Sequence, residues 1–393
     1  MTKKLKILFT HCFGFGGGLI ITHSLCNHLV GLGHDVICIY IKNKLARQEP
    51  LMLDNPKYKV IWLESLPMIS PLTLNKFLKS YLRKNHVDVI VSTGPEGAYL
   101  KTLCSKKSIV HLTSYHHPNP TYADARVFLP NLKCLNPRNI GKWFYRWSLY
   151  FERLTVLKAD VVHCLSKYQK NAACKELGVP ENKIVVIYCG VNIERFVPDR
   201  NIKRESRILY CGGLVSEKGI DVLLKAFSRV IKKHDVSLDI LGDGNWEPYS
   251  QKAMDLGIAD KVHYRGYIAN DQIGGYYKKA YLFVAPTKHE SFGLTIAEAM
   301  AAELPVVSTL TTAIPEVVED SATGILVPWN NVDALANAII LLLNNPKMVN
   351  TMGKAGRKRV EQMFTWKKTT KEIENLIIKN LRSKESYQDE HTI

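Results

Sequence analysis

The chain has 393 residues, enough for two domains of about 100 to 200 residues each. Its residues are 46% hydrophobic, 9% aromatic and 23% charged, which excludes disordered, collagen-like and disulfide-stapled mini-protein classes. Lys and Arg (53) outnumber Asp and Glu (36), and the formal net charge of +17 indicates an acidic partner.

Short β-branched runs alternate with longer helical patterns along the whole chain. The expected strands are, in chain order, 6–10, 35–40, 59–64, 87–93, 108–114, 160–166, 183–188, 207–213, 238–244, 261–267, 281–286, 305–310 and 324–328. Near-continuous apolar strands separated by helices are typical of parallel sheets that are covered on both faces. The sequence therefore predicts an α/β fold with two doubly wound, Rossmann-like sheets.

The polar stretch from Pro198 to Arg207 has no apolar periodicity and is expected to be a linker. We therefore expect an N-terminal domain over 1–197 and a second domain over 208–365. Helical text continues from Asn345 to Arg382, and we expect 366–393 to form a helix that returns toward the N-terminal domain, with a polar tail.

The positive charge is concentrated in the first half of the chain. Residues 1–195 hold 27 basic and 12 acidic side chains, whereas the remainder holds 26 and 24. Within this half, 130–158 interleaves Lys and Arg with Trp, Tyr and Phe, as interfacial helices do on anionic lipid. An ordinary helix packed on the sheet would also fit. The partner could be a phosphorylated substrate, an anionic membrane surface or a nucleic acid.

The nine cysteines all lie between Cys12 and Cys211, mostly in apolar runs, which favours reduced thiols in a cytosol. No run reaches the roughly 18 uncharged apolar residues of a membrane span. We expect a cytoplasmic protein that is at most peripheral on the inner face of the cell membrane.

Two glycine-containing loops are candidates for binding phosphate. Gly14 to Gly18 follows the first strand and precedes helical text, so that it could cradle an anion or could simply form a tight turn. Cys211 to Gly219 has the same context, and its Lys218 could reach a phosphate or could be a solvated surface lysine.

The segment from His289 to Ala302 is the most informative part of the chain. Glu290 and Glu298 are eight residues apart, on either side of a Phe-Gly turn that opens a helix. Carboxylates accept hydrogen bonds from sugar and ribose hydroxyls, and the amides of a helix start suit a diphosphate. The alternative, two solvated helix glutamates, is disfavoured by the apolar residues around them.

The second half of the chain resembles the donor domain of family 4 retaining glycosyltransferases. Six motifs carry this resemblance, in the order GGL-x3-KG, LGDG, YRGYI, APTKHESFGLTIAEAMAAELPVVST, IPEVVED and TGILVP. The first half is similar to the acceptor domain of the same family, through the motifs GGG, GHDV, ADVVHCLS and YCGVNIERF. Glu290 and Glu298 match its E-x7-E motif. The resemblance implies the GT-B fold, in which two domains face each other across a cleft.

By this resemblance, Glu290 would bind hydroxyls of the donor sugar and Glu298 the ribose. The amides of Phe292, Gly293 and Leu294 would bind the diphosphate of the donor. No cofactor is implied beyond this co-substrate, a UDP- or GDP-sugar.

The resemblance also places Lys218 on the diphosphate, Gly16 and Gly17 against the donor from the other domain, and the base near Arg265 to Ile268, which includes the candidate Gly266. Gly213 stands where the family usually has Arg, which leaves Lys218 as the recognisable cation. We expect no metal ion, because there is no DxD-type acidic pair at a strand end.

Candidate residues also follow two strands of the first half. His116 lies where the family carries a cleft histidine near the reacting sugar, and it is favoured over His117 by the family's H-x-P pattern. Its expected role is to position the donor sugar or to polarise the site. His117 and Glu96, which follows another strand, are candidates for the acceptor side.

The sequence thus predicts a retaining, metal-independent hexosyltransferase with Glu290, His116 and Lys218 as its catalytic residues. It would transfer a sugar to a lipid-linked or glycan acceptor in cell-envelope glycan synthesis. A two-domain nucleotide-sugar epimerase is one alternative, and it would need no acceptor. A polyanion or nucleic-acid binder is another, but it leaves the Glu290 to Glu298 segment unexplained, so we expect no nucleic-acid partner.

Overall fold

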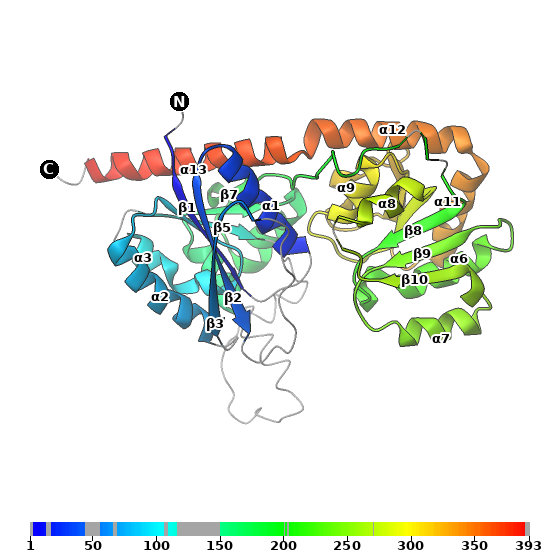
Figure 1. The fold of residues 1–393 in the computed structure, drawn as a ribbon, viewed down its shortest axis with the longest axis horizontal. Coiled ribbons are helices and arrows are strands. Elements are labelled where there is room, and N and C mark those ends of the chain that lie inside the picture. The colour runs from blue at the N-terminus through cyan, green and yellow to red at the C-terminus, as the bar shows by residue number, and fades with distance from the viewer. Residues whose placement is uncertain are drawn as a thin grey trace, which may run out of the picture. The chain divides into compact units, whose positions relative to one another are not determined.

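A computed structural model of the protein describes residues 3–12, 17–43, 56–65, 69–105, 109–115, 150–199, 201–202, 204–269 and 271–389. The chain divides into two compact units, which Figure 1 shows as ribbons. Unit 1 comprises Met1–Tyr188 and Trp366–Ile393, and unit 2 comprises Cys189–Thr365. Each unit is built around one parallel β-sheet.

The sheet of unit 1 has seven parallel strands in the order β3-β2-β1-β4-β5-β6-β7. Their bounds are Lys6–Cys12 (β1), Asp35–Asn43 (β2), Lys59–Ser65 (β3), Val89–Ser92 (β4), Val110–Tyr115 (β5), Val161–Cys164 (β6) and Ile184–Val186 (β7). The direction of strand order changes between β1 and β4. In open α/β sheets, ligands bind beyond the carboxyl ends of the strands at such a switch point.

Helices cover both faces of this sheet (Figure 1). They are α1 (Gly17–Gly31), α2 (Ser70–Lys84), α3 (Leu100–Ser105), α5 (Lys167–Ala172) and α13 (Trp366–Asp389). The buried leucines of α2 and α3 pack with Leu8 and Ile90 of the central strands. Helix α1 packs on the other face, where α13 contacts it.

A buried polar contact attaches α13 to the rest of unit 1. The ring of His34 accepts the backbone N–H of Leu5 at Nδ1 (3.2 Å), which leaves the proton on Nε2. Nε2 lies 3.1 Å from the Glu374 carboxylate on α13 and donates to it. Trp366, the first residue of α13, stacks on His28 of α1.

The sheet of unit 2 has six parallel strands in the order β10-β9-β8-β11-β12-β13. Their bounds are Arg207–Cys211 (β8), Ser237–Leu241 (β9), Val262–Gly266 (β10), Leu282–Ala285 (β11), Val306–Thr309 (β12) and Gly324–Val327 (β13). The helices are α6 (Ile220–Val230), α7 (Glu247–Asp255), α8 (Ile273–Lys279), α9 (Leu294–Ala301), α10 (Ile314–Val317), α11 (Val332–Asn344) and α12 (Pro346–Met363). The switch point of this sheet lies between β8 and β11, so the loops after these two strands are neighbours.

The predicted fold class is confirmed, because each apolar run named above contains a strand of one of two parallel sheets. One boundary of the prediction differs from the structure. The C-terminal helix expected over 366–393 is α13, and α12 ends before it because the backbone leaves the helix at Phe364, whose carbonyl accepts the N–H of Val191 (2.8 Å). The first domain ends at Tyr188 rather than at 197, because Val191 pairs with Thr365 and Phe196 packs on Tyr277 within unit 2.

Within the described ranges, no helix is both long enough and apolar enough to span a membrane. Seven cysteines are free thiols, and five of these seven are buried: Cys26, Cys38, Cys104, Cys164 and Cys189.

Candidate active site

The loop after β8 brings Lys218 to the switch point of the unit 2 sheet. Lys218 ends a short 3₁₀ turn, and Gly219 follows with φ +72° before α6 begins. A Cβ atom on Gly219 would lie 2.0 Å from the carbonyl oxygen of Pro286, which belongs to the loop after β11. Glycine is therefore required here, because its missing side chain lets the two loops touch.

The loop after β11 carries Glu290, and its carboxylate meets Lys218. The Lys218 Nζ donates to Glu290 Oε1 at 2.5 Å, and the two side chains are 29% and 18% exposed. The pair joins residues 72 positions apart in the sequence. Two residues that the sequence assigned separately to diphosphate and sugar therefore lie in direct contact.

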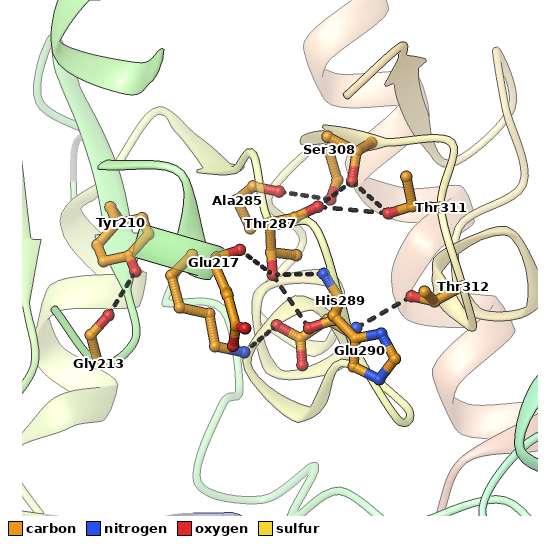
Figure 2. A network of polar contacts seen from close by, with 12 residues as sticks. Tyr210, Gly213, Glu217, Ala285, Thr287, His289, Glu290, Ser308, Thr311 and Thr312 are labelled. Carbon is orange, nitrogen blue, oxygen red and sulfur yellow. Dashed lines mark hydrogen bonds and ion pairs between the residues drawn. The ribbon is translucent and has the colours of Figure 1, made fainter. Parts of the chain in front are cut away.

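A row of hydroxyl groups holds the loop after β11 in place, as Figure 2 shows. The hydroxyls of Thr309 and Thr311 donate to the carbonyl of Thr287, and the Thr287 hydroxyl donates to the carbonyl of His289 (3.2 Å). On the other side, the carbonyl of Glu217 accepts the N–H of Lys288 (2.7 Å). The loop is thus fastened to both neighbouring loops of the sheet edge.

Phe292, Gly293 and Leu294 form the start of α9. Phe292 is 2% exposed and its ring packs edge-on against Phe364, so its side chain is part of the core. Gly293 caps the helix with φ +96°, and the first helical bond runs from the N–H of Ala297 to its carbonyl (3.0 Å). The N–H groups of the first turn precede this bond and take no part in the regular hydrogen bonding of the helix, as a diphosphate site requires.

Glu298 lies on the second turn of α9, in a poorly solvated position. The Tyr277 hydroxyl donates to Glu298 Oε2 at 3.3 Å, and the tyrosine is fully buried. Burial raises the pKa of Glu298 to about 7, although Tyr277 and the charge of Arg195 favour the ionised form. A carboxyl pKa raised in this way is common at functional sites and is also found in buried structural groups.

The other two predicted glycines of unit 2, Gly213 and Gly266, follow β8 and end β10. The carbonyl of Gly213 accepts the hydroxyl proton of Tyr210 (3.1 Å), so this glycine is fixed within the loop that carries Lys218 (Figure 2). Gly266 ends β10 with φ +69°, and its carbonyl accepts the N–H of Gly242 (2.9 Å). These contacts order the loops after β8, β9 and β10.

Glu96, the acceptor candidate of unit 1, follows β4 and is fully buried. Its Oε1 accepts the Thr10 hydroxyl (3.0 Å) and the Thr93 N–H (3.2 Å), and burial raises its pKa to about 7. A carboxyl enclosed in this way joins β1 to the loop after β4, which favours a structural role over acceptor contact. Gly17 is the first residue of α1, with open space where a Cβ would lie.

Several predicted residues lie outside the described ranges: Gly16, His116, His117 and most of the basic-aromatic segment 130–158. Conversely, sequence reasoning missed Thr312 and Tyr277, whose hydrogen bonds hold Glu290 and Glu298. A tyrosine in a short helix and a threonine after a strand carry no signal of such a contact. Only the spatial order of the strands brings them to the site.

Two family models match the chain. "Glycosyltransferase Family 4" matches residues 15–195, and "Glycosyl transferases group 1" matches residues 192–359. Both describe glycosyltransferases, which favours this function over the epimerase and polyanion-binding alternatives. The two matches meet near the boundary between units 1 and 2.

Among curated relatives, an uncharacterized glycosyltransferase of Methanocaldococcus jannaschii is 28% identical over 75% of this chain and 76% of that protein. A GDP-mannose-dependent alpha-(1-6)-phosphatidylinositol monomannoside mannosyltransferase of Mycobacterium tuberculosis is 30% identical over 56% of this chain. That match spans 63% of the mycobacterial protein, less than two thirds of its length.

Solved structures match over almost the whole chain. A sucrose-phosphate synthase of Thermosynechococcus elongatus has a TM-score of 0.78 at 22% identity, over 97% of this chain and all of that one. The HepE protein of Anabaena, solved with UDP and glucose, has a TM-score of 0.76 at 18% identity, over 95% and 99% of the two chains. The chain therefore belongs to the family 4 glycosyltransferases and has their GT-B fold.

Proposed function

We propose that the protein is a retaining hexosyltransferase that transfers a sugar from a nucleotide-diphosphate donor to a lipid-linked or glycan acceptor. The proposal rests mainly on the contact between Lys218 and Glu290 at the switch point of the unit 2 sheet. A cation, a carboxylate and helix-start amides at one sheet edge match the needs of a diphosphate joined to a sugar. The GDP-mannose dependence of the mycobacterial relative and the UDP bound to the Anabaena protein support a nucleotide sugar as donor.

Each group would have a separate task once the donor is bound. The diphosphate would draw Lys218 away from its ion pair with Glu290 and would accept bonds from the amides of Gly293 and Leu294. Glu290 would then accept hydrogen bonds from the sugar hydroxyls. Glu298, one turn deeper in α9, would accept a hydrogen bond from the ribose.

In the proposed reaction, the bond between the anomeric carbon of the sugar and the diphosphate oxygen breaks. A new bond forms between that carbon and an acceptor hydroxyl oxygen on the same face of the sugar. The hydroxyl proton passes to the leaving diphosphate. Lys218 and the helix-start amides stabilise the negative charge that develops on the diphosphate, which is why we propose that no metal ion is needed.

The acceptor of the proposed reaction is an anionic molecule. The excess of basic side chains in residues 1–195 suits an acceptor with phosphate groups, or one presented at an anionic membrane surface. Lipid-linked intermediates of cell-envelope glycans have both properties. The phosphatidylinositol mannoside named for the mycobacterial relative is an acceptor of this class. We therefore place the reaction at the cytoplasmic face of the cell membrane.

A thermal-shift panel with UDP, GDP, ADP and their sugars tests the donor site. A nucleotide at 100 times its dissociation constant contributes about 2.7 kcal/mol, or roughly 5 to 10 °C for a unit of this size. We expect this shift with the nucleotides of one base, a smaller shift for Lys218→Ala, and no loss for Lys225→Ala on exposed α6 surface. The proposal fails if no nucleotide stabilises the protein.

A further inference from the structure

Thr312 has a backbone conformation that threonine rarely adopts. It follows β12, in the loop that leads into α10, and its φ is +51°. β-Branched residues are disfavoured in this left-handed region, where glycine is the usual choice. Such outliers persist where the surrounding structure holds them, and they concentrate at functional sites.

The side chain of Thr312 has a specific contact that glycine could not make. Its Oγ1 accepts the backbone N–H of Glu290 at 3.0 Å, and Figure 2 shows the two residues facing each other. Glu290 is thereby held at two points, at its amide by Thr312 and at its carboxylate by Lys218. The first of these contacts does not have to break when a diphosphate takes up the charge of Lys218.

Two other hydroxyls near the end of β12 act elsewhere. The Oγ1 atoms of Thr309 and Thr311 are 2.9 Å apart, and both hydroxyls donate to the carbonyl of Thr287, three residues before Glu290. They fasten the base of the loop to the sheet, whereas Thr312 contacts Glu290 itself. Loss of the Thr312 hydroxyl should therefore loosen Glu290 while the rest of the loop stays attached.

We infer that Thr312 is a positioning residue that fixes the backbone of Glu290 for recognition of the donor sugar. The inference rests on the proposed function of Glu290. The strained backbone of Thr312 brings its hydroxyl to the Glu290 amide. The contribution of Thr312 is to contacts with the sugar, because the diphosphate is held by Lys218 and the amides of α9.

Thr312→Gly separates the hydroxyl from the backbone conformation, since glycine accepts φ +51° without strain. Thr312→Ser restores the hydroxyl. Ser321→Gly is the matched control, because Ser321 has φ +63° in the turn that precedes β13, at the amino ends of the strands, whereas Thr312 follows the carboxyl end of β12. Affinities are measured by calorimetry for the nucleotide sugar that the thermal-shift panel selects and for the matching nucleoside diphosphate.

For Thr312→Gly we expect the affinity for the nucleotide sugar to fall about tenfold and the affinity for the nucleoside diphosphate to change by less than about twofold. Thr312→Ser and Ser321→Gly should bind both ligands as the wild type does. The inference is overturned if Thr312→Gly binds the nucleotide sugar normally, if both ligands weaken equally, or if serine fails to rescue.

Hydrogen exchange of the free protein gives a second test that needs no ligand. In Thr312→Gly the amide of Glu290 should exchange at least tenfold faster, whereas the amide of Lys288, which donates to Glu217, should keep its rate. Unchanged exchange at Glu290 would refute the positioning role. If exchange at Glu290 is faster in Thr312→Gly but the wild type binds no nucleotide sugar, the contact between Thr312 and Glu290 stands and the donor-site proposal is rejected.

Discussion

Replacement of Glu298 by Gln should stabilise the protein at neutral pH while weakening donor binding. The carboxyl of Glu298 has its pKa raised to about 7, mainly because burial disfavours the ionised form. Gln has nearly the same shape and still offers an oxygen to the Tyr277 hydroxyl, but it carries no charge. The substitution therefore removes the unfavourable ionisation with little change in packing.

The expected gain follows from the pKa. In the unfolded chain the carboxyl titrates near its ordinary value of 4.5, whereas in the folded protein it titrates near 7. Each pH unit between these values corresponds to ~1.36 kcal/mol, so ionisation disfavours the folded wild type by at most ~3.4 kcal/mol. Because the side chain is partly exposed, we expect about 2 kcal/mol.

The direction of the pKa shift of Glu298 sets the pH range over which this residue lowers the stability of the fold. A carboxyl whose folded pKa is raised lowers stability as pH increases from 4.5 toward 7, and the loss is complete above 7. The advantage of Glu298→Gln should therefore be about 2 kcal/mol at pH 8 and well under 1 kcal/mol at pH 5. Melting curves from pH 5 to pH 8 should show the variant melting roughly 4 to 8 °C above the wild type at pH 8.

The functional half of this prediction is a loss of affinity for the nucleoside diphosphate, measured by calorimetry at pH 8. A group that destabilises the fold but binds a ligand shows the trade-off expected at a functional site. A stability difference that does not vary with pH would refute the ionisation argument. Unchanged nucleotide affinity would refute the ribose contact.

Three further predictions follow from the proposed mechanism. Lys218→Ala should weaken nucleoside diphosphate binding by about 2 to 3 kcal/mol through the loss of a charge-assisted contact, and calorimetry should find Lys225→Ala unchanged. EDTA should leave the transfer rate unaltered, and a strict Mg²⁺ or Mn²⁺ requirement would contradict the metal-independent mechanism. In flotation assays the protein should bind anionic but not neutral vesicles, because each nearby basic side chain contributes up to ~1 kcal/mol. Salt at ~0.5 M, or replacement of Arg138, Lys142 and Arg146 by Ser, should release it, and equal binding to both vesicle types would contradict the membrane proposal.

The sheets could be predicted from the sequence because buried parallel strands produce near-continuous apolar runs, as in 281–286 around β11. The E-x7-E spacing likewise predicted that Glu290 and Glu298 lie around the start of one helix, and Gly293 caps that helix. These features depend on residues close together in the chain, for which periodicity and turn chemistry are informative.

The contacts between distant segments could not be predicted. The Lys218–Glu290 ion pair requires that β8 and β11 be neighbours, which depends on strand order rather than on local sequence. The left-handed backbone of Thr312 runs against the preference of its residue type. The burial of Glu96 was missed for a similar reason, because its partner Thr10 lies 86 residues earlier.

The most direct test of the account is the rate of nucleoside diphosphate release from the preferred nucleotide sugar, in the presence of acceptor glycolipid, for wild type, Glu290→Ala and Glu319→Ala. Glu319 is a matched control, since its side chain is 62% exposed and forms an ion pair with Arg359 on the surface of unit 2. We predict that Glu290→Ala loses at least ~100-fold in rate with a melting temperature near that of the wild type, while Glu319→Ala keeps its activity. Turnover by folded Glu290→Ala at the wild-type rate would contradict the assignment of the donor sugar site.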